Sequence, residues 1–110
     1  MIPAAPPPAD AVFDALGDRT RRELLVLLRE GERSASELAE PFPSTRSAVS
    51  QHLSVLLDAG LVERRRQGRR RIYRLNAEPL AQLHDWVAVF GAFWDDRLER
   101  LDAYLEEMPE

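Results

Sequence analysis

Hydrophobic residues in the first part of the chain recur every three or four positions, which is the period of an amphipathic helix. A short run of this kind at 10–16 ends at Gly17, and a longer run at 19–30 carries four leucines on one face. Asp18 lies between the two runs, where its side chain can accept hydrogen bonds from the free N–H groups of a following helix. The pattern therefore predicts two consecutive helices.

Two further helices follow in the same pattern. Ser34 and Glu37 form the S-x-x-E signature of a capping box, which predicts a short helix that ends at the prolines 41 and 43. Thr45, or alternatively Ser44, can cap the helical run TRSAVSQHLSVLLDAG. This run has leucines and valines on one side of a helical wheel and small polar residues on the other. Two helices joined by a tight turn, the second with a slim polar face, are typical of a helix-turn-helix that enters the DNA major groove.

The polar face of this fourth helix contains candidate base contacts. Glutamine can hydrogen-bond adenine and arginine can hydrogen-bond guanine through two atoms each, and serine can donate or accept. We assign direct base reading to Arg46, Ser47, Ser50 and Gln51. Ordinary exposed polar positions are the alternative interpretation.

After Gly60 the pattern changes to that of two short strands. LVERRR and RRRIYRL flank Gln67-Gly68, a dipeptide that favours a hairpin turn. Pairing across that turn would place three pairs of arginines opposite each other: Arg66 with Arg69, Arg65 with Arg70 and Arg64 with Arg71. Opposed like charges destabilise a strand pair, so this hairpin is expected to lie beside a polyanion. A solvated charged loop and a compositional accident are the alternatives.

A helical pattern returns at Asn76 and continues to about Met108. A helix of that length would be about 45 Å long. A domain of this size cannot cover so long an apolar face, so we predict that the helix packs against its copy in a dimer. The sequence leaves open whether Gly91 divides the run into two helices.

The 110 residues suit one compact unit, in which we expect a disordered Pro-rich leader at 1–9, a DNA-binding domain at 10–75 and a dimerisation helix at 76–108. The absence of cysteine excludes disulfides and thiolate metal sites. No apolar run reaches the ~18–20 residues that cross a bilayer, and the start of the chain lacks signal-peptide features. We therefore expect a cytoplasmic protein without a membrane partner.

Charge is segregated along the chain, although the net charge is only -4. Residues 19–74 contain thirteen arginines and seven acids, whereas residues 75–110 contain two arginines and nine acids. A basic middle followed by an acidic end favours nucleic-acid binding by the middle and a different role for the end.

Four stretches together resemble the ArsR family of bacterial transcriptional repressors. They are LGDRTRRELLVLL at 16–28, SASELAEPF at 34–42, AVSQHLSVLLDAGLVERRRQGRRRIYRL at 48–75 and WVAVFGAFWDDRLERLDAYLE at 86–106. The resemblance implies a mainly α winged helix-turn-helix fold, a β-hairpin wing and a long C-terminal dimerisation helix. It also implies a homodimer that represses promoters, often its own, in the bacterial nucleoid and that releases double-stranded DNA when an effector arrives. The operator of such a dimer is expected to be roughly palindromic, with half-sites about 34 Å apart.

The resemblance also assigns residues to roles. The phosphate contacts are expected at Thr45, Ser54, Arg64, Arg65, Arg66, Arg69, Arg70 and Arg71. The dimer interface is expected at Val12, Phe13, Leu16, Val87, Phe90, Trp94, Leu98, Leu101 and Leu105.

The chain departs from the family pattern at several positions. Ser34 and Ser36 occupy the positions of the Cys-x-Cys pair of the arsenic and heavy-metal sensors, and His84 with Asp85 has no second histidine downstream. We therefore expect no metal and no cofactor, and the effector is unknown. Arg19 replaces a frequent proline and Ser54 a frequent lysine, and the second change removes a plausible phosphate contact.

Other features have plainer interpretations. His52 borders the apolar face of its helix, so a structural hydrogen bond is favoured over a metal or acid–base role. Arg21 and Arg22 suit phosphate contact and solvation equally. The aromatic residues 86–94 favour core and dimer packing over a ligand pocket.

No catalytic constellation is recognisable, so the sequence does not indicate an enzyme. The alternatives to DNA binding are a winged-helix module that binds an acidic protein and a double-stranded RNA binder. The second is disfavoured, because a helix cannot read the narrow major groove of A-form RNA.

Overall fold

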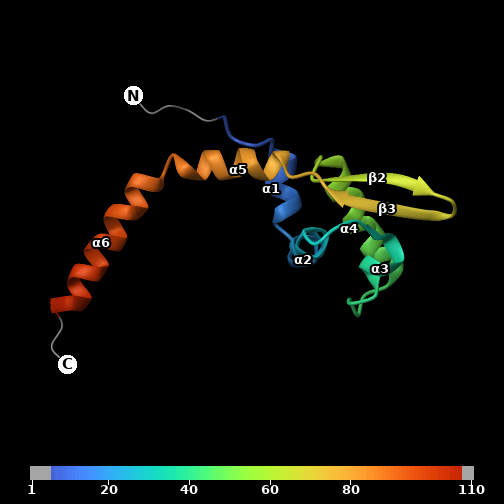
Figure 1. Ribbon diagram of the computed structural model, residues 1–110, viewed down its shortest axis with the longest axis horizontal. Coiled ribbons are helices and arrows are strands. Elements are labelled where there is room, and N and C mark those ends of the chain that lie inside the picture. The colour runs from blue at the N-terminus through green and yellow to red at the C-terminus, as the bar shows by residue number, and fades with distance from the viewer. Residues whose placement is uncertain (1–5, 108–110) are drawn as a thin grey trace.

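A computed structural model describes residues 6–107, apart from the side chains of residues 92, 94 and 95. Six helices and three strands follow in the order α1 (Asp10–Leu16), α2 (Arg19–Leu28), β1 (Arg33–Ser34), α3 (Ala35–Ala39), α4 (Arg46–Asp58), β2 (Val62–Gln67), β3 (Arg70–Leu75), α5 (Glu78–Ala88) and α6 (Gly91–Glu107). Helices α1–α4 gather at the base of the β2–β3 ribbon, which projects beyond them (Figure 1). The mainly helical, winged helix-turn-helix fold predicted from the sequence is confirmed.

The predicted helix starts are confirmed by their caps. The Asp18 carboxylate accepts a hydrogen bond from the backbone N–H of Arg21 at 3.0 Å. Ser34 and Glu37 form the full capping box, in which each side chain accepts from the other residue's backbone N–H. The Thr45 hydroxyl accepts from the N–H of Ala48 at 3.1 Å. Each cap satisfies backbone donors that the first helical turn leaves free.

One apolar core joins α1–α4 to the base of the sheet. Its largest fully buried side chains are Leu24, Leu38, Leu53, Leu56, Leu61, Val49 and Val62. Burial of each leucine contributes about 1.5–3 kcal/mol relative to exposure. This core fixes α4 against the strands and so sets the position of the candidate DNA-binding face.

The sheet has the order β1-β3-β2, and all its pairs are antiparallel. The two-residue strand β1 was not predicted from the sequence, because it is too short to show a period. It pairs with Ile72 and Tyr73 of β3, at the point where α3 begins. Through this pairing the start of α3 is tied to the wing.

The predicted register of the hairpin is wrong. Arg66 lies opposite Arg71, whereas Arg65 lies opposite Ile72 and Arg64 opposite Tyr73. The turn residues are Gly68 and Arg69, not Gln67 and Gly68, and Gly68 has a φ of 64°. A type I′ turn centred on Gln67-Gly68 would require a positive φ at both residues, which is unfavourable for glutamine. With Gly68 and Arg69 as the turn residues, only the glycine has a positive φ. One opposed arginine pair therefore remains instead of three.

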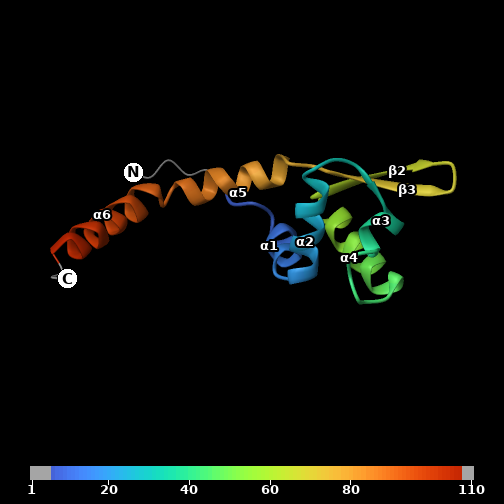
Figure 2. The ribbon, with the colours of Figure 1, turned by 60° about the horizontal axis from the view of Figure 1, so that its bottom comes forward.

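The C-terminal run forms two helices, which answers the question left open at Gly91. The helical conformation is interrupted at Val89 and Phe90, and Gly91 is the first residue of α6. Leu80 of α5 packs against the core, and from there α5 and α6 extend away from the other elements (Figures 1 and 2). No helix within residues 6–107 is long and apolar enough to cross a membrane.

Candidate nucleic-acid interface

Helix α4 turns its apolar side to the core and its polar side to solvent. Val49, Leu53 and Leu56 are buried. All the residues assigned to base reading, together with the two polar candidates for phosphate contact, are exposed: Arg46, Ser47, Ser50, Gln51, Thr45 and Ser54. The structure thus brings these residues together on one accessible face, and their contacts with DNA stay a prediction.

The wing has two faces that differ in composition. Strand alternation places Arg64, Arg66 and Arg71 on the same face as the buried Val62 and Tyr73. We call this the inner face, because its base packs on the core. The outer face carries Glu63, Arg65, Gln67, Arg70, Ile72 and Arg74.

The outer-face arginines are paired with carboxylates. Arg65 binds Glu32 at 2.5 Å, Arg70 binds Glu37 at 2.8 Å, and Arg74 binds Glu63. The pKa of Arg74 is raised, first through its hydrogen bond with Glu63 and then through the charge of that carboxylate. Among the described residues, no carboxylate forms an ion pair with the inner-face arginines, with Arg69 in the turn or with Arg46.

Sequence reasoning treated the six wing arginines alike and so missed this division. Alternation along β2 already places Arg65 on the same face as Glu63 and opposite to Arg64. The partners Glu32 and Glu37 come from the segment around β1, which no sequence pattern had placed beside the wing.

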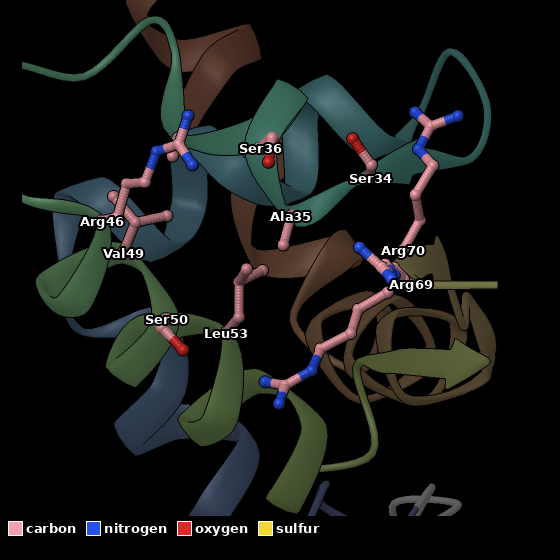
Figure 3. Close-up of a pocket in the computed structure, with 11 residues that line it drawn as sticks. Ser34, Ala35, Ser36, Arg46, Val49, Ser50, Leu53, Arg69 and Arg70 are labelled. Atoms are coloured by element: carbon pink, nitrogen blue, oxygen red, sulfur yellow. The ribbon is translucent and has the colours of Figure 1, made fainter. Parts of the chain in front are cut away.

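A cavity of about 310 Å³ lies between α3, α4 and the wing. Figure 3 shows Arg46 at one side, Arg69 and Arg70 at the other, and Ala35 and Leu53 between them. Serine hydroxyls of α3 and α4 also line the cavity, and none of its lining residues is acidic. Arg70 is paired with Glu37, but the other lining arginines have no carboxylate partner among the described residues. Their guanidinium groups and the hydroxyls form a surface that suits a phosphate group.

Comparison with known proteins decides the family. The model of the bacterial regulatory proteins of the arsR family matches residues 18–64. The HTH-type transcriptional regulator Rv2034 of Mycobacterium tuberculosis is 46% identical over 67% of this chain and 69% of its own. The chain belongs to the ArsR family. The transcriptional repressor SdpR of Bacillus subtilis is 35% identical over 72% of this chain and 88% of its own.

The ArsR fold is matched as well. An ArsR-like transcriptional regulator from Rhodococcus sp. RHA1 superimposes with a TM-score of 0.70, at 38% identity, over 91% of this chain and 92% of its own. ArsR proteins are DNA-binding transcriptional regulators, so this chain is a regulator of transcription and not an enzyme.

Two arginines of this ArsR protein bind backbone carbonyls of α1. Arg21 donates to the carbonyl oxygens of Ala15 at 2.7 Å and Asp14 at 3.0 Å, and its Nη1 lies 3.3 Å from Nδ1 of His52. Arg22 donates to the carbonyl oxygen of Leu16 at 2.8 Å. These contacts join α1 to α2 and α4. They give both arginines a structural role that the sequence had not suggested.

His52 makes a structural hydrogen bond, as expected. A guanidinium can only donate, so Nδ1 of the imidazole must be the acceptor in its contact with Arg21. Asp18 lies 3.7 Å from the same ring atom. The pKa of Asp18 is lowered, first by the hydrogen bond from the backbone N–H of Arg21 and further by the charge of the Arg21 guanidinium.

The residues assigned to the dimer interface differ in exposure. Val12 is buried in the protomer's own core and Leu16 is partly buried, whereas most of the others are exposed: Phe13, Val87, Phe90, Leu98, Leu101 and Leu105. The side chain of Trp94 lies outside the described residues. Tyr104 of α6, 62% exposed, extends this apolar surface and was missed in the sequence.

Aromatic contacts continue the same surface. The rings of Phe13 and Trp86 meet edge to face at 5.6 Å, and those of Trp86 and Phe90 at 5.5 Å. Arg97 lies over the ring of Phe93 at 4.4 Å. The Phe13–Trp86 contact packs α5 against α1.

No metal site is visible in the part of the chain that the structure describes. His84 lies 3.4 Å from Asp85, both exposed, and no set of three or more His, Asp or Glu side chains is placed to hold an ion. Ser34 and Ser36 both line the cavity beside the wing. Serine hydroxyls are poor ligands for the soft metals that a cysteine pair would select.

Proposed function

We propose that this ArsR regulator is a homodimeric repressor that binds a roughly palindromic operator, its own promoter included. In this proposal α4 of each protomer lies in a major groove, and the wing contacts the adjacent backbone or minor groove. The repressor SdpR, which is similar over 88% of its length, supports the direction of regulation. Such a protein acts at the nucleoid, in the bacterial cytoplasm.

One observation carries this proposal most directly. The polar face of α4 is exposed beside wing arginines that have no carboxylate partner among the described residues. Unpaired guanidinium groups bind phosphates without first losing a protein partner. Hydroxyl and amide side chains next to them are suited to base edges. We therefore assign base reading to Arg46, Ser47, Ser50 and Gln51.

The phosphate contacts of the proposal fall on the inner face. We propose that Arg64, Arg66 and Arg71 bind the DNA backbone together with Arg69 of the turn. Each phosphate contact adds about 0.9 to the slope of the logarithm of affinity against the logarithm of salt concentration. Thr45 at the N-cap of α4 and Ser54 on the exposed side of that helix complete the proposed phosphate contacts as hydroxyl donors.

The dimer is proposed from the apolar residues that α1, α5 and α6 leave exposed. Phe13, Val87, Phe90, Leu98, Leu101 and Leu105 are each between 37% and 57% exposed. A second copy of the chain would cover this surface, and a two-fold axis would set the half-sites about 34 Å apart. The acidic residues of these helices would then lie away from the DNA.

The test is fluorescence anisotropy with a duplex from upstream of the gene and with a scrambled duplex, across a salt series. The triple variant Arg64→Ala/Arg66→Ala/Arg71→Ala is expected to lower the salt slope by about 3 per protomer. Wild-type protein is expected to prefer the upstream duplex. Equal binding to both duplexes would refute autorepression, and a duplex selected from a random pool would then replace the upstream one.

The matched control is the outer-face variant Arg65→Ala/Arg70→Ala/Arg74→Ala. It removes the same charge from the same ribbon, so long-range electrostatic attraction falls equally in both variants. Because these side chains are paired with Glu32, Glu37 and Glu63, we expect its salt slope to change by less than about 1 per protomer. No binding of wild-type protein to any duplex at low salt would reject DNA binding and favour an acidic protein partner.

A further inference from the structure

Two glutamates outside the wing hold two of its arginines. Glu32 precedes β1 and binds Arg65, and Glu37 lies in the first turn of α3 and binds Arg70. Each arginine lies 33 positions away from its partner in the sequence. Both ion pairs therefore join the outer face of the wing to the segment that contains β1 and the start of α3.

Stability does not account for these pairs. All four side chains are roughly half exposed, at 43–60%, and exposed ion pairs contribute little to folding because water and salt screen them. A carboxylate next to a DNA-binding surface also repels the phosphate backbone. The two ion pairs themselves therefore add little stability, and both carboxylates are expected to weaken overall DNA affinity.

Glu37 is fixed more firmly than a free surface carboxylate. One of its oxygens, Oε1, accepts both from the backbone N–H of Ser34 at 3.0 Å and from Arg70 at 2.8 Å. The pKa of Glu37 is lowered, chiefly by that backbone N–H, so the side chain stays charged at neutral pH. The capping box thus holds a charged carboxylate beside the wing at neutral pH.

We propose that Glu32 and Glu37 are specificity-determining residues that withhold Arg65 and Arg70 from the phosphates of non-operator DNA. This inference rests on the proposed function. At an operator, α4 in the groove fixes the pose of the wing, and the inner-face arginines fill the phosphate positions within reach. On other sequences no such pose is imposed, and any free arginine adds affinity. Pairing the outer-face arginines therefore lowers non-operator binding more than operator binding.

The test is the double variant Glu32→Gln/Glu37→Gln. Glutamine keeps the acceptor that the capping box needs at position 37, so α3 is preserved while both arginines lose their charged partner. The measurement is anisotropy with the duplex that wild-type protein selects from a random pool and with its scrambled version, at about 0.1 M salt and across a salt series.

We expect affinity for the scrambled duplex to rise about fivefold to tenfold, with a steeper salt slope. Affinity for the selected duplex is expected to rise by less than about twofold, so the ratio of the two affinities falls. Equal rises on both duplexes, or no rise on the scrambled one, would overturn the inference. If wild-type protein selects no duplex at all, the proposed function fails, and this inference fails with it.

The control is the variant Glu23→Gln/Asp96→Asn. These two acids pair with Arg19 and Arg100, at 3.0 Å each, on α2 and α6. The control changes the net charge by the same amount and also frees two arginines. Neither the substituted acids nor the freed arginines lie on the wing. We expect it to leave the affinity ratio unchanged. A fall equal to that of the wing variant would show an effect of net charge alone.

Discussion

Arg21, Arg70 and Arg71 show how neighbouring acceptors divide one residue type among several roles. Arg21 reaches carbonyl oxygens of α1 and the ring of His52. Arg70 reaches the carboxylate of Glu37, whereas no carboxylate pairs with Arg71 within the described part of the chain. Since a guanidinium offers five donors and no acceptor, the acceptors within reach determine whether it builds the fold or remains available to a ligand.

The variant Arg21→Ala tests the structural role of that residue. It removes hydrogen bonds from a charged donor to Ala15 and Asp14, and we expect the free energy of unfolding to fall by about 1–3 kcal/mol. The salt slope of DNA binding should stay unchanged, because the guanidinium is already engaged with α1. Urea denaturation measures the first quantity and anisotropy the second. A slope that falls by about 1 with unchanged stability would assign Arg21 to a DNA phosphate instead.

At the scale of elements, local signals in the sequence predicted more than long-range ones. The caps at Asp18, Ser34 and Thr45 could be predicted because a cap and the N–H it binds lie within three residues. The register of the wing could not, because it depends on which residue of the turn takes a positive φ. The ion pairs of Glu32 and Glu37 were also missed, since they join residues that only the folded sheet brings together.

The candidate site divides in the same way. The exposed face of α4 follows from helical periodicity alone, and all four residues assigned to base reading lie on it. The separation of the wing arginines into a paired and an unpaired set needed the position of β1 and α3 beside β3. The DNA contacts of these residues are predicted from the sequence and the structure together.

The turn of the wing offers a prediction with an internal control. Gly68 has a φ of 64° and open space around it, so alanine there would be strained by its backbone and not by a clash. We expect Gly68→Ala to lower the free energy of unfolding by about 1–2 kcal/mol. Gly91→Ala makes the same change in open space at the start of α6, where φ is not positive. It should be neutral or stabilising by about 0.5–1 kcal/mol. Equal effects in urea denaturation would contradict the turn geometry.

At the scale of the whole molecule, the basic and acidic parts of the chain occupy different regions. The basic middle forms the compact winged unit, and the acidic end forms α5 and α6, which extend from it within an envelope of 62 × 41 × 21 Å (Figure 2). A long helix with an exposed apolar side is costly for an isolated protomer. The shape therefore favours a second copy that covers α6 and leaves both winged units free for DNA.

Leu98 and Val26 allow a matched test of that assembly, since both are 57% exposed. Leu98 lies on α6 in the proposed interface, whereas Val26 lies on α2 outside it. A glutamate at the interface would be buried without a partner, so Leu98→Glu is expected to raise the dimer dissociation constant at least tenfold, measured by analytical ultracentrifugation. Operator affinity should fall by a factor of about 100 or more, because the second half-site loses its effective concentration. Val26→Glu adds the same charge and should change neither quantity. A wild-type monomer, or a dimer that Val26→Glu dissociates and Leu98→Glu does not, would place the interface elsewhere.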